Sequence, residues 1–177
     1  MPIRKFQGIT PKLGNGVYID EMALVIGDVE IGDDSSMWPM TVARGDVHRI
    51  RIGARTNIQD GSVLHVTSDN QFNPGGFALT IGDDVTVGHG AILHACTIHA
   101  RSLIGMHAVV LDAAVVESEV LVGAGAVVPP GKRLKSGYLY LGAPAKQVRE
   151  LTAREREYFL FSSAHYVNLK NKHMADV

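Results

Sequence analysis

Residues 81–128 read IGDDVTVGHGAILHACTIHARSLIGMHAVVLDAAVVESEVLVGAGAVV, and this stretch decides the fold. A branched aliphatic residue returns at almost every sixth position, and a small or β-branched residue follows most of them four places later. The aliphatic positions are Ile81, Val87, Leu93, Ile98, Ile104, Val110, Val116, Val122 and Val128. A short fixed period indicates a solenoid, in which each turn buries its inner face against its neighbours. Hexads predict a triangular parallel β-helix with about 18 residues in each coil.

The repeat continues beyond this stretch in both directions. Hexads begin near Val25 and end near a Pro-Pro-Gly sequence. They lose their phase at residues 43–51, where alternating side chains predict a strand. They are broken again at residues 66–80, which we interpret as a loop inserted in one coil, and such insertions often lie on a binding face. The chain is therefore expected to be one domain, 1–177, with β-helix coils over about 20–133.

A helix is expected after the coils. Thr152 and Glu155, three residues apart, form the pattern of a capping box, and no proline or glycine follows as far as Lys172. We therefore predict a C-terminal α-helix over about 152–172 that packs along the solenoid. The stripe expected to make this packing, at helical spacing, is Tyr158, Phe161, His165 and Leu169.

Composition argues against several classes of function. Lysine and arginine total 17 against 18 aspartates and glutamates, and the net charge of −1 does not favour binding to nucleic acid or anionic membranes. No apolar run approaches transmembrane length, and residues 1–6 lack the apolar segment of a signal peptide. The single cysteine, Cys96, can form no internal disulfide, which fits a reducing compartment. We expect a cytoplasmic protein.

Three histidines fall at informative places in the repeat. His65 directly follows Leu64 and His94 directly follows Leu93, at equivalent places in successive coils once the loop is removed. Their side chains should stack at about the 4.8 Å spacing of neighbouring strands. Two imidazoles at that spacing can share a metal ion with Zn–N bonds of about 2.0–2.1 Å. His89 lies on another side of the triangle, so it can reach the same ion only from a second copy of the chain.

The other histidines are expected to be ordinary surface residues. They are His48, His99, His107, His165 and His173. His107 lies 18 residues after His89 and would stack on it in an unbroken repeat, but the repeat slips by one residue before Ile98. This slip places Met106 beside His89 instead.

Polar residues accompany the three central histidines. Arg44 and Asp46 alternate along one strand, as do Asn57 and Gln59, and Asp60 comes next. Such groups can orient metal ligands or a bound water. Buried amides and ion pairs also serve as structural ladders or as contacts between subunits. The residues alone leave this choice open.

Together these residues resemble the γ-class carbonic anhydrase family, in particular its short bacterial members that lack an acidic loop. The resemblance covers nearly the whole chain. Its motifs are Arg44-Gly45-Asp46, Asn57-Ile58-Gln59-Asp60-Gly61, Leu64-His65, and Gly88-His89 followed by Leu93-His94. A later motif, Gly142-Ala143-Pro144-Ala145-Lys146, is shared with hexapeptide acyltransferases and indicates only the superfamily.

The resemblance implies a left-handed β-helix that forms a homotrimer with zinc at its subunit interfaces. His65 and His94 would come from one subunit and His89 from its neighbour. Histidine ligands also suit Fe²⁺ and Co²⁺. The protein would be a carbonic anhydrase-like lyase, and its substrates would be the small molecules carbon dioxide and bicarbonate, interconverted by a metal-bound hydroxide.

The resemblance also implies roles for the polar residues. Arg44 and Asp46 would form an interface ion pair near the metal, with Arg44 also available to bicarbonate. Gln59 would hold the hydroxide, and Asn57 and Asp60 would support the site.

Two further positions complete the comparison with the family. Tyr166 resembles the family's active-site tyrosine on the C-terminal helix. The inserted loop departs from the pattern, because well-characterised active members carry glutamates there, one of them a proton shuttle. Residues 66–80 contain no glutamate and one acid, Asp69. His48 or buffer would then have to accept the proton.

Two other functions fit the same scaffold. Hexapeptide acyltransferases use acetyl-CoA and a catalytic histidine without metal, and fold alone says little about function. A metal-binding scaffold or thioesterase-like protein could keep the histidines without carbonic anhydrase activity.

Overall fold

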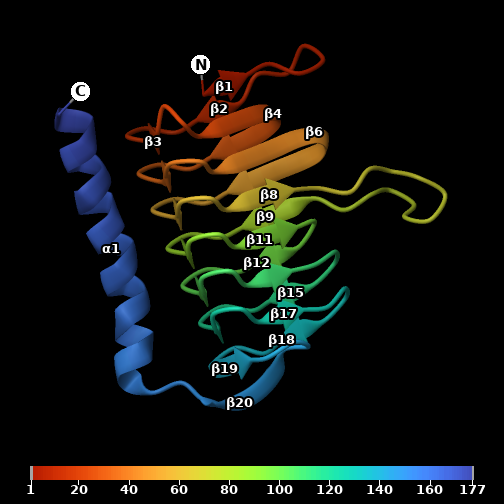
Figure 1. Cartoon of the computed structure of the whole chain (residues 1–177), viewed down its shortest axis with the longest axis vertical. Coiled ribbons are helices and arrows are strands. Elements are labelled where there is room, and N and C mark those ends of the chain that lie inside the picture. Colours follow the sequence, from red (N-terminus) through yellow and green to blue (C-terminus); the bar gives the residue numbers. More distant parts are fainter. Residues whose placement is uncertain (1, 177) are drawn as a thin grey trace.

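The computed structural model describes residues 2–176 and is a left-handed parallel β-helix with a long helix beside it (Figure 1). The chain winds around three faces, and strands of successive coils pair in parallel on each face. The predicted all-β solenoid with a C-terminal helix is confirmed.

The strands divide among the three faces as follows. The first face contains β1 (Ile3–Arg4), β4 (Leu24–Ile31), β6 (Val42–Ile52), β8 (Val63–His65), β11 (Ile92–His94), β14 (Val109–Val110) and β17 (Val127–Val128). The second contains β2 (Lys12–Leu13), β9 (Leu79–Ile81), β12 (Thr97–Ile98), β15 (Val115–Val116) and β18 (Arg133–Leu134). The third contains β3 (Tyr18–Ile19), β5 (Ser36–Met37), β7 (Asn57–Ile58), β10 (Thr86–Val87), β13 (Leu103–Ile104), β16 (Leu121–Val122), β19 (Tyr138–Leu141) and the antiparallel β20 (Lys146–Glu150).

The long strands β4 and β6 belong to two faces. The first half of β6 pairs with β8 and its last residues pair with β9. This explains why the hexads lose their phase at residues 43–51, because here the chain crosses a corner as extended strand.

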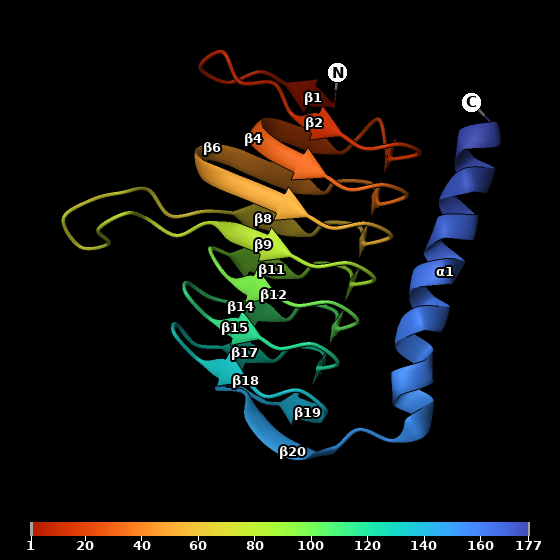
Figure 2. The ribbon, with the colours of Figure 1, turned by 180° about the vertical axis from the view of Figure 1, so that it is seen from behind.

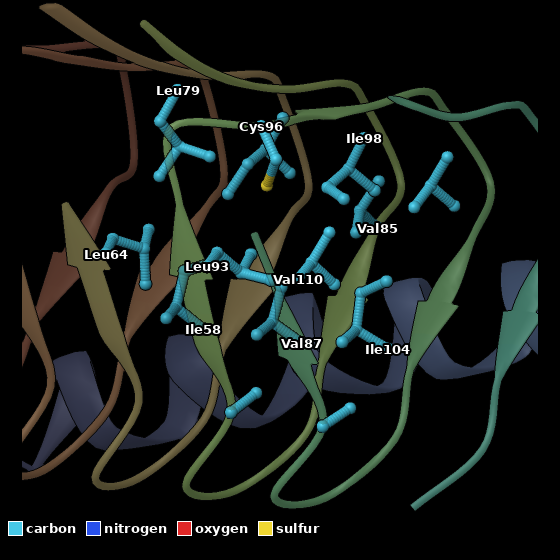
Figure 3. Packing of buried hydrophobic residues seen from close by; sticks show 14 of the residues in the cluster. Ile58, Leu64, Leu79, Val85, Val87, Leu93, Cys96, Ile98, Ile104 and Val110 are labelled. Atoms are coloured by element: carbon cyan, nitrogen blue, oxygen red, sulfur yellow. The ribbon is translucent and has the colours of Figure 1, made fainter. Parts of the chain in front are cut away.

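The hexad aliphatics fill the interior of the prism. Leu64, Leu93 and Val110 pair in register along the first face, and all three are fully buried. Figure 3 shows how closely they pack against side chains from the other faces. Small residues such as Ala91 and Ala108 are fully buried four places after an aliphatic. Close packing of this kind leaves little room for a larger side chain.

The predicted slip in the repeat is present. Leu93 and Ile98 are only five positions apart, yet both occupy core positions. Val87 pairs with Ile104, so two residues further on Met106 is the register equivalent of His89, and His107 follows it with its backbone N–H bonded to the His89 carbonyl.

The solenoid extends beyond residues 20–133. Strands β1 and β2 pair with β4, and β3 pairs with β5, so the residues before position 20 already add to the first coils. Strands β18 and β19 likewise continue the stack after residue 132. The insertion between β8 and β9 is a loop that projects away from the solenoid on the side opposite the helix, as Figures 1 and 2 show.

Helix α1 (Ala153–Ala175) runs along the third face, back toward the N-terminal coils (Figure 2). The predicted capping box is confirmed, because the Thr152 hydroxyl accepts from the Glu155 backbone N–H while the Glu155 carboxylate accepts from the Thr152 N–H. At the other end, the buried Lys170 ammonium lies 3.0 Å from Asp34. Within residues 2–176, no helix combines the length and apolar character needed to cross a bilayer.

The prediction for the helix face is wrong. Tyr158 and Phe161 are more than half exposed, and the buried helix residues are Phe159, Ser162, Ser163 and Lys170. The outward row of the third face is polar at Thr86, which hydrogen-bonds Ser162, and apolar at Leu103 and Leu121, against which Phe159 packs. Small hydroxyl side chains let the helix approach the polar part closely, and Phe159 covers the apolar part, whereas Tyr158 and Phe161 turn to solvent.

The buried hexad leucines should dominate stability. Leu134→Ala removes a fully buried side chain and should lower the free energy of unfolding by about 2–5 kcal/mol. Leu160→Ala is the matched control, because Leu160 is 52% exposed, and it should change stability by less than about 0.5 kcal/mol. Urea unfolding followed by circular dichroism measures both, and equal losses would contradict this packing.

The capping box should make stability depend on acid pH. Hydrogen bonds from Arg149 and then from the Thr152 backbone lower the pKa of Glu155 from 4.5 to about 2. Because this pKa is lowered on folding, the stabilisation is complete above about pH 4.5 and is lost as pH falls through about 2. The difference in unfolding free energy between wild type and Glu155→Gln should be constant above pH 5 and shrink below it. If the difference in unfolding free energy did not change with pH, the lowered pKa of Glu155 would be contradicted. Glu157→Gln, which removes another carboxylate of the same helix, is the control.

Candidate metal centre

The paired strands β8 and β11 bring two histidines together. His65 and His94 are register partners, as their places in the hexads predicted. Nδ1 of His65 lies 3.2 Å from Nε2 of His94, and the ring centroids are 5.2 Å apart. Both side chains are partly buried. Two imidazole nitrogens therefore face each other across neighbouring coils.

A carboxylate contacts the outer nitrogen of each ring. Asp46 Oδ1 lies 3.2 Å from Nε2 of His65, and Asp112 Oδ2 lies 2.9 Å from Nδ1 of His94. An ionised carboxylate can only accept hydrogen bonds, so in the neutral rings these outer nitrogens carry the hydrogens. The two nitrogens that face each other then both present lone pairs.

Two lone pairs that face each other at this distance repel, and a cation bound between the two nitrogens would remove this repulsion. Two nitrogens bound at 2.0–2.1 Å to one tetrahedral zinc ion lie about 3.3–3.4 Å apart, close to the 3.2 Å found here. A proton could also occupy the gap, but burial of His65 lowers its pKa and so disfavours the protonated ring. The residues present fit a divalent metal that prefers nitrogen ligands.

Asp46 links this pair to Arg44. The guanidinium Nη1 lies 2.6 Å from Asp46 Oδ2, which leaves Oδ1 for His65. Burial alone would raise the pKa of Asp46, but hydrogen bonds from Arg44 and His65 outweigh it, and the pKa lies below its ordinary value. The carboxylate is thus ionised at neutral pH, and the expected ion pair exists within one chain.

His89 lies elsewhere, in the turn between β10 and β11. Its Nδ1 is 2.8 Å from Asp60 Oδ2, and Asp60 occupies the equivalent place one coil earlier, as predicted. The His89 side chain is 44% exposed, and its Nε2 is left available. Residues 2–176 of a single chain contain no group of three or more histidine, cysteine, aspartate or glutamate side chains able to hold a metal ion. One chain therefore brings two of the three predicted ligands together.

Carboxylate contacts distinguish these three histidines from the rest. In the part of the chain that the structure describes, the histidines within 4.0 Å of a carboxylate oxygen are His65, His89 and His94. His99, His107, His165 and His173 are exposed, and the half-buried His48 accepts a hydrogen bond from the Arg49 backbone. A carboxylate behind a histidine is the usual arrangement around a protein-bound metal.

The predicted amides lie in a buried chain of hydrogen bonds. Gln59 donates to the Asn57 side-chain oxygen, Asn57 donates to the Thr86 hydroxyl, and Thr86 contacts the Ser162 hydroxyl of helix α1 at 2.8 Å. Because the Gln59 amide nitrogen is committed to Asn57, its carbonyl oxygen is the end left to accept a hydrogen bond. The helix residue Ser162 thus fixes the orientation of Gln59 through two intermediates, Thr86 and Asn57.

A groove of about 340 Å³ lies between helix α1 and the third face. Its walls include Gln59, His89 and Tyr166, together with apolar residues such as Leu103. Tyr166 packs edge-on against Trp38 with ring centroids 5.6 Å apart. Burial, followed by the charge of Asp60, raises the pKa of Tyr166, which keeps the phenol protonated. Tyr166 therefore lines the same groove as His89 and Gln59.

Sequence reasoning missed Asp112, Thr67 and Ser162. The register pairs His94 with Leu111, one residue past the Leu93 and Val110 pair. Asp112 lies one place further on and reaches back to His94. The hexads gave no signal for Asp112, because the coil that follows His94 is 17 residues long and counting leads to Leu111.

Similar proteins indicate the family. The chain is 52% identical to "Protein YrdA" of Escherichia coli over 97% of this chain and 94% of that protein. It is 41% identical to "Gamma carbonic anhydrase 2, mitochondrial" of Arabidopsis thaliana over 94% of this chain and 60% of that protein. It is also 41% identical to "Probable carbonic anhydrase" of Methanocaldococcus jannaschii over 89% of this chain and 94% of that protein.

The fold comparison agrees with the sequence comparison. A hexapeptide transferase family protein from Anaplasma phagocytophilum superimposes with a TM-score of 0.88 and 38% identity, over 96% of each chain. No protein-family model matches the chain.

Breaking the amide chain should cost stability. Thr86→Val replaces a buried hydroxyl by a methyl group and leaves Asn57 and Ser162 without their partner. An unpaired buried polar group costs about 1–3 kcal/mol, and we expect a loss of that size in urea unfolding. Thr80→Val on the exposed outer row is the control, with an expected change below about 0.5 kcal/mol. Equal effects would show that the chain of hydrogen bonds contributes nothing.

Proposed function

The chain belongs to the γ-carbonic anhydrase-like family of hexapeptide-repeat proteins, and on this premise we propose that it is a metal-dependent enzyme for the reversible hydration of carbon dioxide. The observation that carries the proposal is the set of three histidines, each held by a carboxylate. Within residues 2–176 the five other histidines have no such contact, and this difference supports the choice of these three as the ligands.

We propose that the metal lies between two copies of the chain. His65 and His94 would supply two nitrogens, and His89 of the partner subunit would supply the third. Zinc suits three such ligands with an open fourth position, and iron or cobalt would fit the same donors. When bound, the metal lowers the pKa of water to about 7 and so supplies a nucleophile near neutral pH.

The surrounding side chains have separate tasks in this proposal. The free carbonyl oxygen of Gln59 would accept a hydrogen bond from the attacking water and orient it toward carbon dioxide. The Arg44 guanidinium keeps N–H groups beyond the one given to Asp46, and these would bind the bicarbonate anion. Asp46 and Asp60 would keep His65 and His89 in the tautomers whose lone pairs face the metal.

An apolar row on the first face supports association as a trimer. Val63 and Ile92 are register partners on this face and are 40% and 41% exposed. They directly precede the Leu64-His65 and Leu93-His94 pairs. The row therefore lies next to His65 and His94, which together we call the metal half-site. Burying this row against a second chain would remove apolar surface from water. It would also bring the second chain to the place where the third metal ligand is needed.

We propose that the protein is located in the cytoplasm. The buried free thiol of Cys96 agrees with such a reducing compartment.

The test is carbon dioxide hydration by stopped flow, together with the metal content of protein purified without added metal or chelator. Wild type should carry about one metal ion per chain and be active. His89→Ala should lose the metal and fall to the activity of metal-free protein. His107→Ala changes an exposed histidine one coil further on and is the control. Full activity in His89→Ala would contradict the proposal, and metal without activity would favour a scaffold.

An acyltransferase that uses acetyl-CoA is the second candidate. It is favoured by the similarity to the hexapeptide transferase family protein and by the shared Gly142–Lys146 motif. Isothermal titration with acetyl-CoA separates the two functions. Absence of binding would remove the acyltransferase, and binding that leaves metal content unchanged would support it.

A further inference from the structure

Asp112 connects a predicted metal ligand with the inserted loop. It follows β14 at a corner of the solenoid, one coil after His94. One carboxylate oxygen lies 2.9 Å from Nδ1 of His94, and the other accepts a hydrogen bond from the hydroxyl of Thr67. Thr67 is the second residue of the segment that leaves the solenoid after β8. A single carboxylate therefore contacts both elements.

The contacts hold the carboxylate in one orientation. The side chain is 30% exposed, so part of it is removed from water. A carboxylate with one oxygen bonded to Thr67 and the other in contact with His94 cannot rotate freely. It can therefore hold the His94 ring in one tautomer and one orientation.

The backbone explains why this contact is specific. His94 pairs in register with Leu111, and Asp112 is the residue after Leu111. A side chain at position 112 that continued the strand pattern would therefore not contact the His94 ring. The backbone N–H of Ala113 bonds to the carbonyl of Ala95, which places the Asp112 corner directly over the end of β11. The side chain reaches back from this corner to the histidine.

We propose that Asp112, clamped by Thr67, is the positioning residue for His94 and couples the inserted loop to the metal half-site. Asp112 fixes the tautomer with hydrogen on Nδ1, so that Nε2 presents its lone pair toward His65. Thr67 fixes the orientation of the Asp112 carboxylate. The base of the loop thereby affects the orientation of the His94 ring and the affinity of the half-site for metal. The metal affinity part of this inference rests on the proposed function, whereas the tautomer part does not.

The first test is the tautomer of His94 in the full-length chain. Proton–nitrogen correlation spectra of ¹⁵N-histidine-labelled protein, recorded without and with zinc, distinguish hydrogen on Nδ1 from hydrogen on Nε2. Wild type should show the Nδ1–H form in both states. Asp112→Ala should populate the Nε2–H form without zinc, whereas Asp112→Asn keeps an acceptor oxygen and should retain Nδ1–H. An unchanged His94 signal in Asp112→Ala would overturn the inference.

The second test is zinc affinity, measured by competition with a chromophoric chelator. Loss of the partner behind a metal-bound histidine typically weakens binding by about 10- to 100-fold, and we expect this for Asp112→Ala. Thr67→Val, which preserves side-chain shape, should weaken binding less and in the same direction. Asp69→Asn removes the other acid near the loop, whose contact is to the Gly75 backbone, and should leave affinity unchanged.

The outcomes separate the two proposals. If wild type binds no zinc, the proposed function fails, and the tautomer measurement still decides the role of Asp112. If zinc binds and Asp112→Ala and Thr67→Val both retain wild-type affinity, Asp112 is only a loop anchor and the inference is wrong. Thermal unfolding checks that each variant folds. If Asp112→Ala fails to fold, zinc affinity is compared among Asp112→Asn, Thr67→Val and the control Asp69→Asn. Equal zinc affinities in these three variants would overturn the inference.

Discussion

The hydrogen-bonded stacking of one coil on the next is the constraint on which the rest of this structure depends. Because each coil repeats the path of the one before it, the position of a residue in the repeat determines its face and its neighbours. The pairing of His65 with His94, and the place of Asp60 beside His89, both follow from this register. Aliphatic side chains fill the interior, so the polar chemistry lies on the outer surface and at the corners.

Carboxylates convert this stacking into a defined donor set. Stacked imidazoles alone could point either nitrogen at each other, but Asp46 and Asp112 accept hydrogen bonds at the outer nitrogens and leave lone pairs inside. Asp60 does the same for His89 on another edge of the solenoid. The helix acts at a distance, because Ser162 begins the hydrogen-bonded chain that ends at Gln59. In the proposed site the two stacked histidines would be the ligands of one chain, and a second copy would supply the third.

The sequence predicted what the repeat determines and failed where side chains leave it. The buried hexads, the pairing of His65 with His94 and the slip that places Met106 beside His89 could all be counted along the chain. Asp112 could not be found by counting, because its side chain reaches back from a corner to a residue that is not its register partner. The buried face of helix α1 depends on the third face beneath it, which is polar at Thr86 and apolar at Leu103, and the hydrophobic spacing within the helix does not reveal this. The metal, the trimer and the role of Tyr166 stay predictions.

Complementation between two inactive variants tests the shared site most directly. His89→Ala keeps an intact His65 and His94 pair, and His94→Ala keeps an intact His89. Co-expression with two different tags, followed by purification on both, yields only mixed assemblies. In a mixed trimer of either composition, about one third of the interfaces would join the intact halves, and the account predicts that mixed assemblies regain metal and carbon dioxide hydration absent from either variant alone. Mixed assemblies that remain as metal-free and inactive as the separate variants would contradict a site divided between copies.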